Sequence, residues 1–148
     1  MLEELFFILG LVNNLFLIFI FLIREKRRAI LHRIGPIYLL LAIPAVYGIF
    51  LVQQEQKAMQ YTIFLGIFLA YLALEALYDF ILKISFRQNW KLSTPYLCLY
   101  YAMNYGFVVM VWKTYLIGGI IMLALFIIQI IVNIATHSRK SKSKTIDK

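Results

Sequence analysis

Long apolar runs separated by short polar segments dominate the chain. A helix needs roughly 20 mostly apolar residues to cross the hydrocarbon core of a membrane. Three runs are of that order, and a fourth is about twice as long and interrupted by Lys113-Thr114-Tyr115. As one helix that fourth run would extend about 60 Å, twice the core thickness, so it must form two spans. The pattern therefore predicts five transmembrane helices, at 5–23, 34–52, 61–82, 95–112 and 116–135.

Composition agrees with an all-α integral membrane protein. The chain is 63% hydrophobic and 15% charged, with a mean hydropathy of +0.82, whereas a soluble domain is about 45–50% apolar and about 25% charged. This balance excludes a soluble enzyme and a disordered chain. We expect residues 1–137 to form one transmembrane domain, a bundle of five helices. Residues 138–148 are basic, and we expect them to form a disordered cytoplasmic tail.

The basic residues predict the orientation of the spans. Segments 24–33, 83–91 and 138–148 hold five, three and five Lys or Arg residues, whereas the alternate segments hold only Lys57 and Lys113. By the positive-inside rule, the N-terminus lies outside and the C-terminus is cytoplasmic. We expect the cytoplasmic (plasma) membrane of a prokaryote. Because its leader is acidic, we expect the first span to remain in the mature protein.

The net charge of +8 does not indicate a nucleic-acid partner, because the basic residues lie where topology requires them. They suit anionic lipid headgroups, at about 1 kcal/mol per basic residue near the surface. The single cysteine, Cys98, excludes an internal disulfide or a CxxC pair. The chain has no glycine-rich phosphate loop, HExxH or GxSxG motif, and no His pair at ligand spacing. We therefore expect no cofactor and no metal, and an enzyme is disfavoured.

Two carboxylates interrupt the third span, where charge is costly and usually faces a bundle interior or a cavity. Glu75 and Asp79 are four residues apart, so an α-helix places them on one face, together with Tyr71 and Tyr78. Asp79 has a structural alternative, because it can pair with Lys83 and reach the membrane surface.

Small residues lie opposite the polar faces of two spans. On the third span they are Gly66, Ala70 and Ala73, and on the fourth Ala102 and Gly106. Small residues allow helix backbones to approach closely in membranes. We therefore expect another helix to pack on each of these two faces.

Polar residues recur at matching depths in the other spans. Asn14, Asn104 and Gln129 fall near the level of Glu75, and Asn133 near that of Asp79. In the second span Pro44 should kink the helix and free the carbonyl of Leu40. The outer halves of the spans are nearly pure hydrocarbon, which predicts a polar pocket open to the cytoplasm. We list as candidate ion- or substrate-binding residues Asn14, Tyr71, Glu75, Tyr78, Asp79, Tyr100, Tyr101, Asn104, Gln129 and Asn133.

Three functions remain open. The first is a transporter or channel subunit, acting as a homodimer, with Glu75 binding a proton or cation and the tyrosines offering aromatic faces to a cationic substrate. The second is a non-catalytic accessory or immunity-type subunit that binds helices of a partner membrane protein. The third is a lipid-modifying enzyme with Glu75 and Asp79 as acid and base or Mg²⁺ ligands. The buried amides have a structural reading as well, as hydrogen-bonding links between helices.

Overall fold

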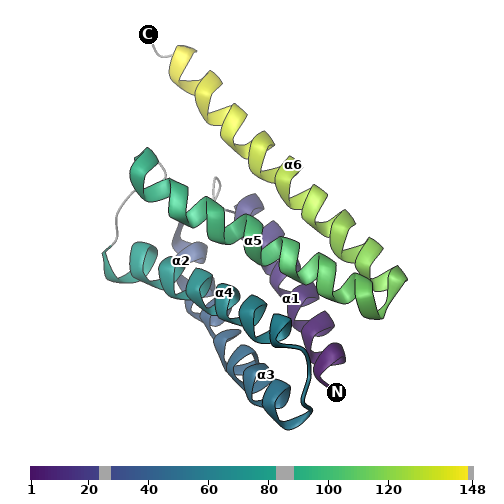
Figure 1. Cartoon of the computed structure of the whole chain (residues 1–148). Helices are drawn as coiled ribbons and strands as arrows, with labels where there is room; N and C mark the ends of the chain where they lie inside the picture. Colours follow the sequence, from purple (N-terminus) through teal and green to yellow (C-terminus); the bar gives the residue numbers. More distant parts are fainter. Residues whose placement is uncertain (24–27, 83–88, 147–148) are drawn as a thin grey trace.

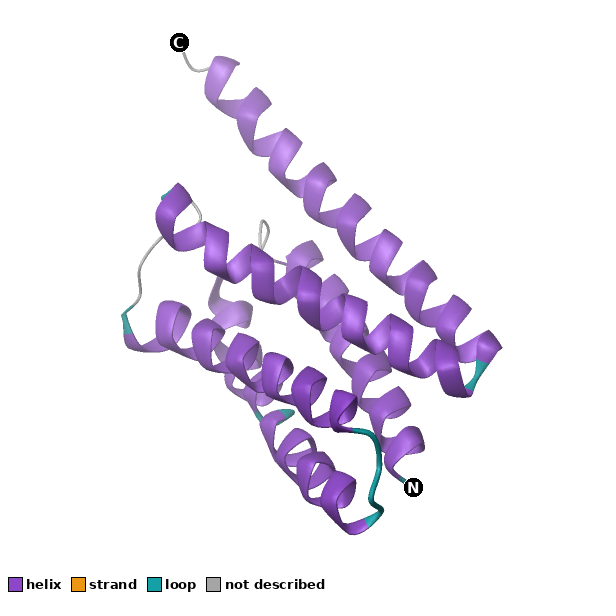
Figure 2. Cartoon of the chain, in the orientation of Figure 1, coloured by secondary structure: helices purple, strands orange, loops and turns teal. Residues whose placement is uncertain are grey.

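The computed structural model describes residues 1–23, 28–82 and 89–146. Within these segments every regular element is a helix (Figures 1 and 2). The elements in chain order are α1 (Leu2–Ile23), α2 (Arg28–Leu39), α3 (Ala42–Gln54), α4 (Met59–Glu75), the π-helix η1 (Ala76–Ile81), α5 (Trp90–Thr114) and α6 (Leu116–Ile146).

Four of the described segments are long and apolar enough to cross a membrane: Leu2–Ile23, Ile34–Gln54, Met59–Tyr78 and Leu116–Ala135. They present large apolar side chains outward, such as Ile43, Phe50 and Ile117, each 60% exposed or more. In water such a surface would be unfavourable by about 25 cal/mol per Å², whereas lipid accepts it. The protein is therefore a membrane-embedded helical protein. The remaining predicted span corresponds to α5, which is not one of these four segments.

The helices pack as one bundle around α1. Helix α1 contacts α2, α3, α5 and α6, and α5 lies between α4 and α6. Aromatic rings join three of these helices: Phe107 of α5 lies 5.1 Å from the Phe6 ring of α1 and 5.4 Å from the Phe68 ring of α4, centroid to centroid. The N-terminus, the α3–α4 turn and the α5–α6 turn share one end of the bundle (Figure 1).

The second span is broken at the position that Pro44 predicts. Helix α2 ends at Leu39 and α3 begins at Ala42, with a turn at Leu40 and Leu41. Proline lacks the N–H that would bond to the carbonyl four residues earlier, which here belongs to Leu40. That carbonyl accepts instead from the Ile43 amide at 3.0 Å. The predicted disruption of the helix is confirmed, whereas the Leu40 carbonyl is not left free, because it accepts from an amide three residues later.

The third span changes its helical geometry directly after Glu75. Helix α4 continues into η1, and the Leu82 amide donates to the Leu77 carbonyl, five residues earlier, at 2.8 Å. The sequence does not predict this change, because residues 76–81 contain no proline or glycine.

Helices α5 and α6 form a tight hairpin. Helix α5 begins at Trp90, ahead of Pro95, and the Asn89 side chain caps it by accepting from the Lys91 amide at 3.1 Å. Tyr115 alone separates α5 from α6, in extended backbone conformation, which confirms the predicted break. Gly119 permits close packing here, because a Cβ at that position would lie 2.7 Å from the Trp112 Cα.

Helix α6 continues past the predicted end of its span. Its backbone is helical to Ile146, whereas the sequence predicts disorder from Ser138 onward. Residues 136–146 contain no glycine or proline to end the helix. The side chains of this segment lie outside the described residues.

The two small-residue faces differ in outcome. The face of α5 is packed as predicted: a Cβ at Gly106 would overlap the Phe64 ring of α4. The other prediction is wrong, because Gly66, Ala70 and Ala73 are exposed, and nothing lies within 4 Å of a Cβ built on Gly66. The bundle side of α4 is occupied by larger side chains, which bury more surface than the small ones would: Leu65, Phe68, Tyr71 and Leu72.

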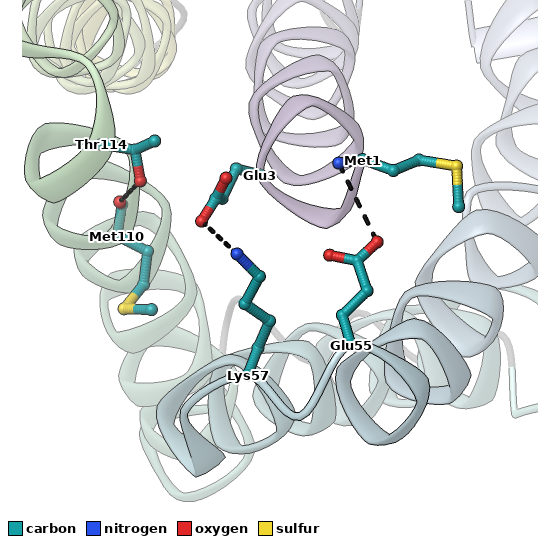
Figure 3. Close-up of polar contacts among 6 residues, drawn as sticks. All are labelled: Met1, Glu3, Glu55, Lys57, Met110 and Thr114. Carbon is teal, nitrogen blue, oxygen red and sulfur yellow. Dashed lines mark hydrogen bonds and ion pairs between the residues drawn. The ribbon is translucent and has the colours of Figure 1, made fainter.

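Polar contacts hold the start of α1 against the α3–α4 turn (Figure 3). The Lys57 ammonium donates to Glu3 at 2.9 Å, and the Met1 amino group lies 3.9 Å from Glu55. The hydrogen bond to Glu3 and the charge of Glu3 raise the pKa of Lys57 above its usual value. Nearby, the Thr114 hydroxyl donates to the Met110 carbonyl at 3.4 Å, within α5.

Candidate functional site

Glu75 is a buried carboxylate in the interior of the bundle. It is the last residue of α4, and its side chain is 6% exposed. It interacts electrostatically with the hydroxyl groups of Tyr38 on α2 and Tyr71 on α4. Leu72 and Tyr71, three and four residues earlier, lie on the same face of α4 and are buried as well. The Glu75 side chain therefore faces the interior of the bundle.

Four buried tyrosines from three helices form a tyrosine cluster near this carboxylate: Tyr38, Tyr71, Tyr96 and Tyr100. The hydroxyls of Tyr71 and Tyr96 are hydrogen-bonded at 2.8 Å, and their ring centroids are 5.3 Å apart. The Tyr100 ring lies 6.3 Å from that of Tyr71. The Tyr38 hydroxyl donates to Asn13 Oδ1 of α1 at 2.7 Å. The cluster therefore connects α1, α2, α4 and α5 with hydroxyl groups.

A second set of polar contacts, the amide network, joins α5, α6 and α1. The Tyr100 hydroxyl donates to Gln129 Oε1 at 2.7 Å, and Gln129 Nε2 donates to the side-chain oxygen of Asn14. Asn14 Nδ2 donates in turn to the Gly10 carbonyl at 2.7 Å. Interhelical hydrogen bonds of this kind contribute about 0.6–2 kcal/mol each in membranes. Tyr100 belongs to both sets, so the tyrosine cluster and the amide network are continuous.

The structure buries most of the candidate site residues and joins Tyr71, Tyr100, Gln129 and Asn14 through ring contacts and hydrogen bonds. The following are buried: Asn14, Tyr71, Glu75, Tyr78, Tyr100, Asn104 and Gln129. Tyr101 is 48% exposed and packs its ring against Tyr100 and Phe126, at 5.3 Å and 6.1 Å. Asn133 is partly buried. Asp79 lies in η1, but its side chain is outside the described residues, as is its expected partner Lys83.

Three contributors were not among the candidate residues. Tyr38 shares the depth of Tyr100 in the sequence pattern, and this was the available signal. Tyr96 lies at the edge of its span, where a tyrosine is typical of the membrane interface. Asn13 is adjacent to Asn14, but a helix turns adjacent side chains by about 100°, so only the neighbouring helices distinguish their roles.

The described residues include no cluster of three or more His, Cys, Asp or Glu side chains that could hold a metal ion. Among the side chains that the structure describes, the polar groups of the interior are the carboxyl group of Glu75, phenol hydroxyls and primary amides. Such groups bind a proton, a cation or water through oxygen atoms and aromatic faces. Comparison with models of protein families, with curated proteins and with solved structures gives no match for this chain.

Proposed function

We propose that the protein is a small transporter or channel subunit that binds a proton or a cation at Glu75, reached from the cytoplasmic side. In this proposal the chain has five spans, with its N-terminus outside and its C-terminus in the cytoplasm of a prokaryote. Five helices are few to line a transport pathway, so the working form is a homodimer. The basic segments contact anionic lipid headgroups.

The burial of Glu75 within a membrane-embedded bundle carries the proposal. A carboxylate in such a place is costly, and its charge requires compensation by a proton, a cation or hydrogen-bond donors. The adjoining tyrosine cluster supplies donors and aromatic faces from three helices. The π-helical turn starts immediately after Glu75, so the backbone that carries the carboxylate is interrupted at the site itself.

The test is flux through liposomes that contain the purified full-length protein. Proton movement is followed with an internal pH-sensitive dye, and uptake of labelled monovalent and organic ammonium cations is measured in parallel. Glu75→Gln keeps the size of the side chain and removes its titration, so we expect loss of flux. Glu4→Gln, the same change at an exposed carboxylate, is the matched control and should retain flux.

Stability measurements on the same variants separate function from packing. We expect Glu75→Gln and Glu75→Leu to melt at or above the wild-type temperature, because each removes the cost of burying a charge. A destabilised Glu75→Gln that still conducts, or a wild-type protein with no flux for any of these ions, would show that the site is structural.

An exposed feature of α4 favours a second function, that of an accessory subunit that binds a partner membrane protein. Gly66, Ala70 and Ala73 form an exposed strip of small residues, the kind of surface on which another transmembrane helix packs closely. Purification from native membranes in mild detergent tests this alternative. Recovery of the wild type, but not of Gly66→Leu, in a stable complex with another membrane protein would favour the accessory role.

A further inference from the structure

Two buried amide side chains retain one polar atom each without a protein partner. Asn13 is 0% exposed and Asn104 is 1% exposed. Asn13 Oδ1 accepts from Tyr38, and Asn104 Nδ2 donates to the Tyr100 carbonyl at 2.9 Å. Among the residues that the structure describes, Asn13 Nδ2, a donor, and Asn104 Oδ1, an acceptor, have no hydrogen-bond partner. Most buried polar side-chain atoms in proteins have one, from protein or ordered water.

Packing places these two amides at one level of the α1–α5 interface. A Cβ on Gly10 would lie 2.7 Å from the Phe107 ring. Asn13 comes about one turn after Gly10, and Asn104 about one turn before Phe107. Because Phe6 contacts Phe107 and Phe21 contacts Tyr100, the two helices run antiparallel. Asn13 therefore lies beyond Gly10, and Asn104 beyond Phe107, toward the same end of the bundle.

Helix periodicity also places the amides on the faces that meet. Asn13 follows Phe6 by seven residues and Asn104 precedes Phe107 by three, and both spacings keep side chains on one helix face. The Phe6 and Phe107 rings lie 5.1 Å apart. The donor of Asn13 and the acceptor of Asn104 therefore face a common interface, and they are complementary to a molecule that accepts one hydrogen bond and donates another.

We propose that a buried water molecule bridges Asn13 and Asn104, accepting from Nδ2 of Asn13 and donating to Oδ1 of Asn104. Water fits because it both accepts and donates, and internal waters make two to four hydrogen bonds to buried polar groups. A metal cation does not fit, because the Nδ2 group is a donor. This hydration site lies in the protein interior, and it is independent of whether Glu75 binds an ion.

Radiolytic footprinting in ¹⁸O-labelled water tests the site in the full-length protein in lipid nanodiscs. Hydroxyl radicals formed from a bound water oxidise side chains near it, and the reporter is Met103, which precedes Asn104 in sequence and is 1% exposed. Met110 lies on the same helix and is the matched control, because the two are 1% and 2% exposed. We expect ¹⁸O incorporation at Met103 and none above background at Met110. Equal labelling of the two methionines, high or low, would overturn the proposal.

Substitution locates the water. Asn104→Leu removes the acceptor while retaining a similar volume, and it should abolish labelling of Met103. Persistent labelling of Met103 in a folded Asn104→Leu protein would overturn the assignment to this pair. If Asn104→Leu does not fold, the comparison of Met103 with Met110 in the wild type decides alone. If labelling of Met103 disappears in Glu75→Gln but persists in Asn104→Leu, the water is bound at the Glu75 carboxylate, which contradicts the proposal.

Discussion

Gly106 and Gly66 are on neighbouring helices and face opposite environments. A Cβ at Gly106 would overlap the Phe64 ring, whereas nothing lies within 4 Å of a Cβ on Gly66. The same substitution therefore has a different cost at each position. At Gly106 a larger side chain must displace an aromatic ring that helps to join α4 to α5.

We expect Gly106→Leu to destabilise the bundle by at least about 1–3 kcal/mol, the usual cost of overpacking. Gly66→Leu, the matched control, should change stability by less than about 0.5 kcal/mol in the isolated chain. Thermal melts in detergent measure both. Equal melting temperatures for wild type and Gly106→Leu would show that α4 and α5 are not in close contact.

The contact between Lys57 and Glu3 makes the stability of the folded protein depend on pH in the alkaline range. The bond to Glu3 raises the pKa of Lys57, so the folded state holds this proton more tightly than the unfolded state. The stabilising contribution is therefore fully present below the ordinary lysine value of 10.5. It is lost as pH rises through the raised pKa of the folded state.

We expect the melting temperature of Lys57→Gln to lie below that of wild type at neutral pH and to converge with it well above pH 10.5. Because the pair is partly exposed, the difference is small and decreases with salt. Glu3→Gln should behave in the same way as Lys57→Gln. A difference in melting temperature between wild type and Lys57→Gln that stays constant from neutral to strongly alkaline pH would contradict a stabilising Lys57–Glu3 pair.

At the residue scale, the burial of polar side chains was predictable and their choice of partner was not. The polar pattern identified Glu75, Asn104 and Gln129 as residues of the interior, and the structure buries all three. It could not indicate that Tyr100 reaches Gln129 or that Asn13 receives the Tyr38 hydroxyl. Those contacts depend on which helices are neighbours, and periodicity along one helix carries no such information.

At the element scale, backbone chemistry explains which boundaries could be foreseen. Pro44 lacks an amide hydrogen, and the break in the second span follows from that. The π-helical turn after Glu75 has no comparable cause in the sequence. The exposed face of Gly66 was misassigned because small residues favour close packing without specifying a partner, and the larger side chains of α4 pack in the bundle instead.

The last part of α6 provides the prediction at this scale. Residues from Ser138 onward contain a single large apolar residue, Ile146, and can bury little surface against the bundle. We expect deletion of 138–148 to change the free energy of unfolding by less than about 0.5 kcal/mol. Melts and size-exclusion profiles of the shortened chain check this, with the full chain as reference. Loss of the folded bundle would show that this segment packs against it.

At the scale of the whole molecule, the order of helices determines which turns share a side of the membrane. The N-terminus, the α3–α4 turn and the α5–α6 turn lie at one end of the bundle (Figure 1). The alternation of basic segments predicts that this end is outside. Single cysteines introduced into a Cys98→Ala chain test the orientation directly.

We expect Gln56→Cys and Thr114→Cys to react with a membrane-impermeant thiol reagent on intact cells. Gln88→Cys and Ser141→Cys should react only after the cells are opened, which serves as the control for reactivity. Labelling of Gln56→Cys and Gln88→Cys from the same side would contradict the five-span topology.

The one-residue turn at Tyr115 has a consequence for biogenesis. Helix α5 is not among the four segments apolar enough to cross a membrane, while α6 begins with a highly apolar stretch directly after it. With no linker between them and with Gly119 packed against Trp112, the two helices cannot separate at this end. We therefore expect the insertion machinery to receive them as a hairpin. A chain that ends at Thr114 would leave α5 at the membrane surface, because the apolar partner with which it inserts is missing.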